Sequence, residues 1–199
     1  QACSRRWADS LLLSERSWAV TFYKPDFEAL RAAPTRIVIA VGEESVEVYT
    51  GRTAIALAEH TAGSQEAFAS LMNSYAAKIG MKGSNFVNAH GLSAPEHFST
   101  AHDLARLGQA LIRDFPETYA FNKIKEFTVG TITQPNRNLL LWRDPAVDGI
   151  KTGHHSGAGY CLMSSAMRGD QRLIAVVMGS TSEKQRADDS MALLNWGFR

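Results

Sequence analysis

Cysteine is scarce in this sequence, with two residues, Cys3 and Cys161, among 199. They lie far apart and form neither a Cys-x-x-Cys pair nor a spacing typical of a zinc site. Cys161 stands in an apolar strand pattern, which predicts a small, buried hydrophobic side chain. No His, Cys or Asp spacing in the sequence matches a zinc or iron site, so we expect no metal site, and we also expect no cofactor.

Net charge and long apolar runs are also lacking. Lys and Arg number 21 against 20 Asp and Glu, a formal net charge of +1, which argues against nucleic acid or a strongly anionic membrane surface as a partner. No apolar run approaches the roughly 20 residues of a membrane span, so no membrane segment is expected. The chain opens at Gln1 without an apolar leader, so we expect that any signal peptide was removed or never included.

Residues 1–50 show the least regular pattern in the chain. Within them, Arg36–Val41 is typical of a strand, and Val46–Thr50 of a second. From Thr53 helix formers dominate and predict a helix that ends at Gly63. We therefore separate residues 1–50 from a domain over residues 51–199.

The middle of the chain predicts two more helices. Ser64 is the expected N-cap of a helix that ends at Gly80, and Ser99-Thr100 caps a third that Pro116 closes. The Gly- and Asn-rich stretch 82–93 between them predicts a loop. Beyond the third helix, Glu126–Val129 alternates as a strand does, and Gln134–Asn138 is expected to be a polar connection.

The last third predicts an antiparallel sheet followed by a helix. Strands are expected at residues 149–153, 159–167 and 172–179. The apolar run Leu173–Met178 predicts a central strand. Ser182 is the expected cap of a helix over Glu183–Trp196. Helices in the middle and antiparallel strands at the end predict an α+β fold.

One short stretch of the predicted sheet has the chemistry of a binding site. Lys151, Thr152 and Gly153 follow one another on a predicted strand. A cation and a hydroxyl beside a groove suit a carboxylate, and a glycine lets a ligand's main chain approach closely. Because three residues recur by chance, an exposed edge strand with a solvated lysine is the alternative.

Longer runs favour the binding site. They are Ala56–His60, Ala62–Ser64, Phe68–Asn73, Phe86–Leu92, His97–Ala105, Asn136–Asn138, Val147–His154 and Leu194–Arg199. In this order, over Thr53–Arg199, they resemble the low-molecular-mass penicillin-binding proteins, the serine-type D-alanyl-D-alanine carboxypeptidases.

The resemblance implies an α+β fold of the β-lactamase/DD-peptidase type, in which helices pack against an antiparallel sheet. This chain is expected to be incomplete at the N-terminus and to lack the family's β-rich second domain and membrane anchor. The implied substrates are peptidoglycan pentapeptides that end in D-Ala-D-Ala, and β-lactams are implied ligands. The implied location is the periplasm or cell envelope.

The family catalyses acyl transfer with three motifs. Ser-x-x-Lys supplies the acylated serine and its lysine base, Ser-x-Asn helps to shuttle the proton, and Lys-Thr-Gly binds the terminal carboxylate. Lys151, Thr152 and Gly153 match the third motif, and His154 matches the residue that follows it. We therefore expect these four residues to contact substrate.

Two arginines extend the implied site. Arg137 takes the place of an arginine that the family keeps near the groove, and Arg186 is a candidate for a second. A carboxylate clamp and an ion pair that pins the loop both remain open for Arg137. Among nearby polar residues, Asp148 is expected to fix the approach to the strand and not to transfer protons.

The first two motifs are not found. The Ser-x-Asn position falls on Thr50–Arg52, where Thr50 keeps a hydroxyl and completes an expected catalytic set with Lys151 and Thr152. The nearest matches to Ser-x-x-Lys, Thr21–Lys24 and Thr181–Lys184, lack the family's flanking residues. We therefore expect the chain to hydrolyse such peptides poorly or not at all. The alternatives are a non-catalytic module that binds peptidoglycan peptides or β-lactams, and a truncated fragment.

The histidines outside the strand are expected to be structural. His90 and His97 are expected to satisfy main-chain groups of the loop through a ring nitrogen. His102 is expected to be a solvated helix residue. None of them has a spacing that matches a zinc or iron site.

Overall fold

The structure, a computed structural model, describes residues 46–199, with side chains from Thr53 onward except that of Val129. The predicted strand Arg36–Val41, Thr21–Lys24 and Cys3 lie outside this part. The chain divides into two compact units. Among the described residues, the first holds 46–78 and 84–98, and the second holds 79–83 and 99–199.

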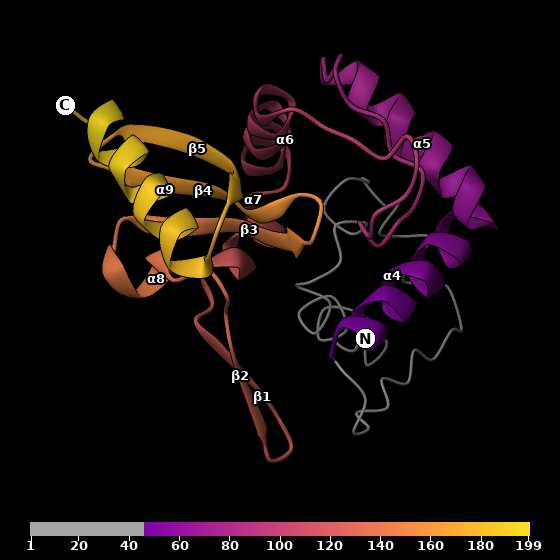
Figure 1. The fold of residues 1–199 in the computed structure, drawn as a ribbon, viewed down its shortest axis with the longest axis horizontal. Helices are drawn as coiled ribbons and strands as arrows, with labels where there is room; N and C mark the ends of the chain where they lie inside the picture. Colours follow the sequence, from indigo (N-terminus) through magenta and orange to yellow (C-terminus); the bar gives the residue numbers. More distant parts are fainter. Residues whose placement is uncertain (1–45) are drawn as a thin grey trace. The chain divides into compact units, whose positions relative to one another are not determined.

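The first unit contains two helices, α4 (Val46–Ala62) and α5 (Gln65–Lys78), which pack against each other (Figure 1). The predicted strand at Val46–Thr50 is wrong, because these residues form the first turns of α4. Their β-branched and aromatic side chains favour strands only weakly, and the alanine-rich stretch that follows propagates the helix. Ser64 caps α5 as predicted, since its Oγ accepts from the amide of Ala67 at 3.1 Å.

The predicted loop after α5 is confirmed and is held by side chains. Asn73 on α5 donates to the Phe86 carbonyl and accepts from the Phe86 amide, both at 2.8 Å. His90 Nδ1 accepts from the amide of Leu92, and His97 Nδ1 from that of Val87, both at 3.2 Å. These histidines satisfy loop amides, as expected, and burial lowers the pKa of His90.

The second unit opens with α6 (Ala101–Asp114). Thr100 caps it as predicted, with Oγ1 accepting from the amide of Asp103 at 3.1 Å. His102 on its first turn is largely exposed, as expected. Pro116 then begins the short helix α7 (Pro116–Tyr119), which continues into the 3₁₀ turn η1 (Ala120–Lys123).

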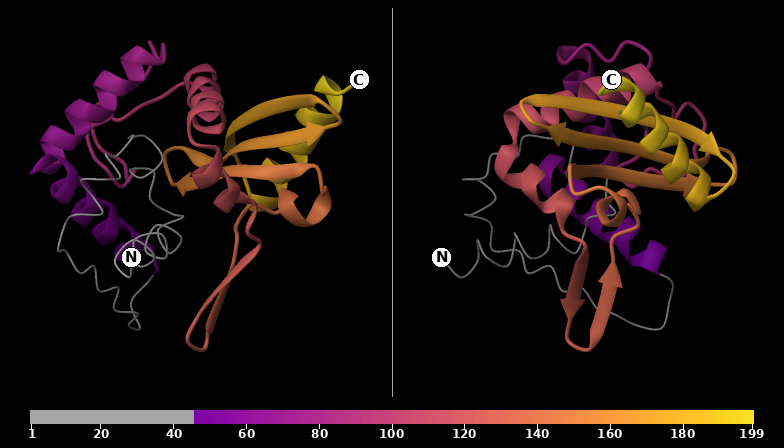
Figure 2. Two further views of the ribbon diagram at one scale, coloured as in Figure 1. Left: turned by 180° about the vertical axis from the view of Figure 1, so that it is seen from behind. Right: turned by 90° about the vertical axis from the view of Figure 1, so that its left-hand side faces the viewer.

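A two-stranded hairpin follows, formed by β1 (Glu126–Val129) and β2 (Ile132–Pro135). Figures 1 and 2 show that it projects away from the main sheet of its unit. The first strand was predicted. The assignment of Gln134 and Pro135 to a connection is wrong, because both lie in β2. The side chains of β2 have no buried face, so the strand leaves no alternating pattern in the sequence.

Three strands form the main sheet, β3 (Val147–His155), β4 (Gly159–Arg168) and β5 (Gln171–Ser180), all antiparallel. Their order is β3-β4-β5, so β4 is the middle strand among the described residues. Within this part of the chain β5 pairs on one side only, so the expectation that Leu173–Met178 is a central strand stays a prediction. The short helix α8 (Leu140–Arg143) precedes β3, and α9 (Glu183–Gly197) follows β5.

Helices on both faces explain the apolar run in β5. Leu173 and Ala175 join the core that includes Leu194 of α9. Ile174, which points the other way, lies against Gly108 of α6, where a Cβ would stand 3.5 Å from Ile174 Cδ1. The same Cβ would stand 3.0 Å from Met163 Sδ of β4. A strand that is covered on both faces carries a near-continuous apolar run in its sequence.

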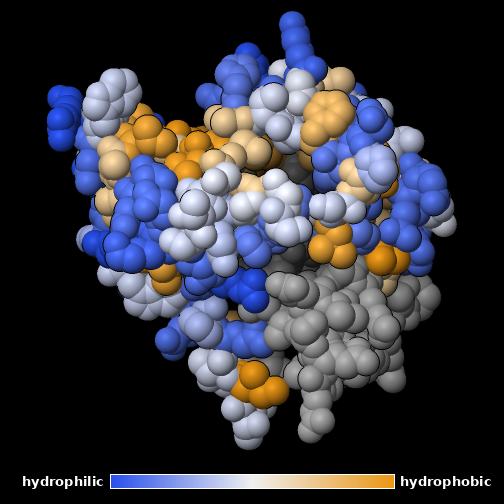
Figure 3. All heavy atoms as spheres, in the orientation of Figure 1, coloured by the Kyte–Doolittle hydropathy of each residue, from blue (hydrophilic) through white to orange (hydrophobic). Residues whose placement is uncertain are grey.

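The visible surface mixes polar and apolar residues (Figure 3). An apolar area appears where Figure 1 draws β5. Within the described part of the chain, no helix has the length and apolar character needed to cross a membrane.

Candidate functional site: the outer edge of strand β3

Strand β3 carries the Lys-Thr-Gly motif along one edge of the main sheet. Lys151 pairs with Met163 of β4, Thr152 with Leu162, and Gly153 with Cys161. Since β4 pairs with β3 on one side only, the other side of the motif is the outer edge of this sheet among the described residues. Main-chain groups on such an edge can pair with an extended ligand.

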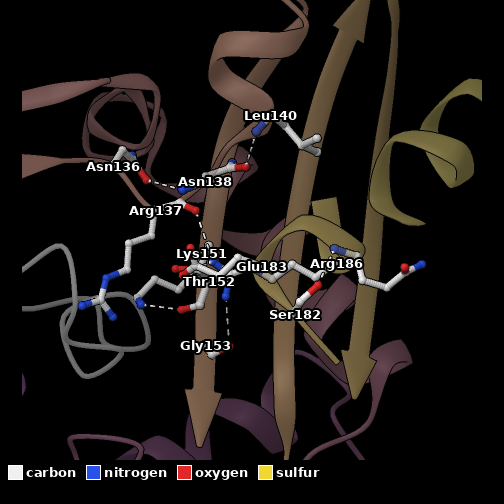
Figure 4. Close-up of polar contacts among 11 residues, drawn as sticks. Asn136, Arg137, Asn138, Leu140, Lys151, Thr152, Gly153, Ser182, Glu183 and Arg186 are labelled. Carbon is white, nitrogen blue, oxygen red and sulfur yellow. Dashed lines mark hydrogen bonds and ion pairs between the residues drawn. The ribbon is translucent and has the colours of Figure 1, made fainter. Parts of the chain in front are cut away.

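Two cations reach the same side of β3. Figure 4 shows the side chains of Arg137 and Lys151 extending together to the side away from β4. The Lys151 ammonium donates to the Thr152 carbonyl at 2.7 Å. Lys151 is half-buried and Arg137 is exposed. Two cations beside an open strand edge are suited to an anion, and a planar guanidinium can hold a carboxylate with two hydrogen bonds.

Two asparagines fix the main chain on either side of Arg137. Asn136 Nδ2 donates to the Ile124 carbonyl at 3.0 Å, and Asn136 Oδ1 accepts from the amide of Asn138 at 3.0 Å. Asn138 is buried, and its Nδ2 donates to the carbonyl of Gly149 on β3 at 3.0 Å. The segment that carries Arg137 is thus tied to the foot of the hairpin and to β3.

Arg186 joins the same segment from the other side. It extends from α9 across β4 to β3 (Figure 4), and its exposed fraction is 2%. One nitrogen donates to the carbonyl of Gly153 at 3.5 Å, and the other donates to that of Arg137 at 3.2 Å and pairs with Glu183 at 3.4 Å. Burial lowers the pKa of Arg186 from its ordinary value, and Glu183 partly offsets this.

The end of the strand carries an aromatic stack. The ring of His154 lies on that of Tyr160, with centroids 4.0 Å apart and planes at 29°, and Arg186 lies over the same tyrosine at 5.6 Å. Cys161, the next residue along β4, is half-buried and its thiol donates to the Ala158 carbonyl at 3.4 Å. The prediction of a buried cysteine is therefore wrong, because Cys161 lies near the end of the sheet, where less of it is covered.

Asp148 anchors the start of the motif strand. Tyr119 donates its hydroxyl to Asp148 at 2.6 Å, and Arg172 on β5 pairs with both carboxylate oxygens at 2.9 and 2.8 Å. Arg172 also donates to the Ser165 hydroxyl at 2.7 Å. A carboxylate held by a tyrosine and a bidentate arginine fits the expected role of fixing the approach to the strand.

The second unit brings six of the seven predicted site residues to one place. They are Arg137, Lys151, Thr152, Gly153, His154 and Arg186. Thr50 lies in α4, in the stretch whose side chains are not described, so its role stays a prediction. Among the described residues, no cluster of three or more His, Cys, Asp or Glu is arranged to hold a metal ion.

The sequence reasoning did not foresee the residues that hold the site. Asn136 and Asn138 flank Arg137 within a run that resembles the family, which was the available signal. Tyr119 and Arg172 left no such signal in the sequence, because they lie 29 and 24 residues away from Asp148 along the chain.

Comparison with known proteins identifies this arrangement. A model of the D-alanyl-D-alanine carboxypeptidase family matches residues 6–182, which includes most of the N-terminal segment. D-alanyl-D-alanine carboxypeptidase DacC of Escherichia coli is 49% identical over 186 residues, covering 92% of this chain and 44% of that protein. The chain thus spans less than half the length of this relative.

Solved structures agree with the family match. Penicillin-binding protein 5 from Haemophilus influenzae has a TM-score of 0.74 at 36% identity, covering 95% of this chain and 62% of that one. Penicillin-binding protein D2 from Listeria monocytogenes, solved in an ampicillin-bound form, has a TM-score of 0.70 at 31% identity, covering 76% and 63%. The predicted α+β fold of the DD-peptidase type is confirmed, and the chain belongs to the D-alanyl-D-alanine carboxypeptidase family.

Proposed function

We propose that this chain binds peptidoglycan stem peptides that end in D-Ala-D-Ala through the outer edge of β3. The observation that carries the proposal is the common direction of the Arg137 and Lys151 side chains beside that edge. A peptide that lies along β3 gains main-chain hydrogen bonds, and its terminal carboxylate meets two cations. Because Lys151 donates to the Thr152 carbonyl, its ammonium exchanges this acceptor for the carboxylate on binding.

Calorimetry with two matched peptides tests the proposal. One is an N-acylated peptide that ends in D-Ala-D-Ala with a free carboxylate, and the other is the same peptide with a C-terminal amide. We expect the acid to bind at least tenfold more tightly, because hydrogen bonds to a charged group contribute about 1.5–3 kcal/mol. Lys151→Ala removes most of this preference, whereas Lys184→Ala, on α9, keeps it. No binding of the acid at millimolar concentration would overturn the proposal.

The family's hydrolytic activity is a separate matter. The family is named for D-alanyl-D-alanine carboxypeptidase activity, but the sequence contains neither Ser-x-x-Lys nor Ser-x-Asn. We propose that this chain is impaired or inactive in hydrolysis. Incubation with a fluorescent penicillin followed by denaturing electrophoresis is the test, and we expect no labelled band. A boil-stable fluorescent band would contradict this and would show that another nucleophile is present.

β-Lactams are proposed as ligands of the same edge. The ampicillin-bound relative from Listeria monocytogenes supports this choice, and penicillins carry a carboxylate like that of the peptide. Since peptidoglycan lies outside the cytoplasmic membrane, we also propose the cell envelope, the periplasm in particular, as the location. Secretion of the full-length protein, followed by cell fractionation, is the measurement for this part.

A further inference from the structure

We infer that Arg186 is a positioning residue that holds Arg137 in register with Lys151, and that it does not itself contact the ligand. The inference rests on the proposed function, since it assigns Arg186 a role in carboxylate binding at the edge of β3. It changes the expected role of Arg186 from a substrate contact to a support for one.

Arg186 is buried, and its hydrogen bonds point to main-chain carbonyls. The exposed fraction of Arg186 is 2%, whereas Arg137 is exposed. Arg186 donates to two main-chain carbonyls, those of Arg137 and Gly153, which belong to the two segments that meet at the site. A guanidinium whose donors are used in this way holds the two segments together and leaves the anion to Arg137 and Lys151.

The planar shape of the Arg186 side chain lets it fix the spacing of these two carbonyls. A guanidinium is planar and presents its donors in a fixed fork, so its two terminal nitrogens set the distance between the carbonyls they bind. The ring of Tyr160 lies under this group at 5.6 Å, and Glu183 contacts one nitrogen at 3.4 Å. The fork is therefore oriented from α9 and β4 together, as Figure 4 shows for its approach to β3.

The flanking asparagines complete the support. Asn138 holds the segment to β3 through the Gly149 carbonyl, and Asn136 holds it to the carbonyl of Ile124. Neither of these contacts involves the carbonyl of Arg137 itself, which accepts from Arg186. Arg186 thus adds, at the Arg137 carbonyl, a contact that the two asparagines do not make.

A double-mutant cycle tests whether Arg186 acts through Arg137. Arg186→Lys keeps the positive charge but loses the fork, and we expect it to weaken binding of the D-Ala-D-Ala acid about tenfold without weakening binding of the matched amide. In an Arg137→Ala background the same substitution is expected to change affinity less than twofold. Arg143→Lys, which alters the Arg143–Asp188 ion pair between α8 and α9, is the matched control. It should leave the affinity for both the acid and the amide unchanged.

Two outcomes of the cycle would overturn the inference. An equal loss in both backgrounds would mean that Arg186 contacts the ligand independently of Arg137. Full affinity for the acid in Arg186→Lys would mean that charge alone suffices and that the fork positions nothing.

Hydrogen exchange of the ligand-free protein separates this inference from the proposed function. We expect Arg186→Lys to raise exchange of the amides in residues 136–142, among them that of Asn138, with no change in β4 and β5. Unchanged exchange in 136–142 would overturn the inference even if peptides bind. Should the wild-type chain bind no peptide, the proposed function fails, and the exchange result alone decides whether Arg186 positions Arg137.

Discussion

Tyr119 shows how a single hydroxyl links three elements near the site. It lies at the end of α7, binds Asp148 at 2.6 Å, and has the Arg172 guanidinium 5.6 Å from its ring. Burial, followed by the hydrogen bond to Asp148, raises its pKa above the ordinary value of 10.0. The folded protein therefore keeps the phenolic proton at pH values where the unfolded chain releases it.

This raised pKa predicts a loss of stability at alkaline pH. The contribution of Tyr119 is complete below pH ~10, the unfolded value, and falls as the pH rises beyond it towards the folded value. We expect Tyr119→Phe to lower the free energy of unfolding by about 1–2 kcal/mol at pH 8. At pH 11 the difference in free energy of unfolding between wild type and this variant should be smaller by about 1 kcal/mol. Urea unfolding at both pH values measures this, and a gap that does not shrink would contradict it.

Residue roles were predictable where the partner is close in the chain. Ser64, Thr100 and Ser182 were assigned as caps because a cap binds an amide three residues ahead. The roles of Asn138 and Asp148 depend on partners that the fold brings from farther away, so their types alone left them undetermined.

Gly108 on α6 lets that helix approach the sheet. A Cβ at this position would stand 3.0 Å from both Ile150 Cδ1 and Met163 Sδ. We expect Gly108→Val to destabilise the protein by about 1–3 kcal/mol through overpacking. Gln109→Val, on the exposed neighbour, introduces the same side chain into the same helix and serves as the control. Equal stability of the two variants in urea unfolding would show that the contact is not tight.

Two neighbouring leucines of helix α9 test the packing on the opposite face of the sheet. Leu194 is 1% exposed and belongs to the core, whereas its neighbour Leu193 is 47% exposed. We expect Leu194→Ala to cost about 2–5 kcal/mol, because it leaves a cavity against β4 and β5. Leu193→Ala should stay within about 0.5 kcal/mol of wild type. Thermal or urea unfolding of both variants is the measurement, and similar losses would contradict the packing.

Elements with a buried face were predictable, and those without one were not. β4, β5 and α9 carry apolar positions at strand or helix spacing because one face packs on the core. β2 is largely exposed and α8 is four residues long, so neither leaves a periodic signal. β3 was predicted too short because the bulge between Val147 and Gly149 interrupts its alternation.

At the scale of the whole molecule, the formal charge of +1 leaves little long-range field. Any preference for anions must therefore come from the local pair, Arg137 and Lys151. We expect Lys151→Gln to weaken binding of the D-Ala-D-Ala acid and to flatten its dependence on salt. Lys184→Gln changes the net charge equally, but the Lys184 side chain on α9 is 80% exposed, and this variant should leave both the affinity and its salt dependence unchanged. Calorimetry at 0.05 and 0.5 M NaCl tests this. Equal effects of the two variants would mean that the net charge of the whole molecule, and not the local pair, sets the affinity for the anion.

The fold of the molecule was predictable because many ordered runs resemble one family, and the comparisons confirm it. The gathering of Arg137, Lys151, Thr152, Gly153, His154 and Arg186 in one place was predictable for the same reason. The attacking group was not, since the sequence offers no serine in the expected pattern and Thr50 has no described side chain. Locating a nucleophile depends on distances to Lys151 that spacing in the sequence does not supply.

The projecting hairpin has a practical consequence. At its tip, apart from the two chain neighbours of Gly130, no described residue has an atom within 4 Å of where a Cβ would stand, and Thr131 is exposed. A fluorophore attached through Thr131→Cys, after replacement of Cys3 and Cys161, should leave the fold intact. Because β2 leads directly into Asn136 and Arg137, such a dye sits on the same short segment as Arg137, the cation proposed to bind the carboxylate. It would make the chain an optical sensor for ligands at β3.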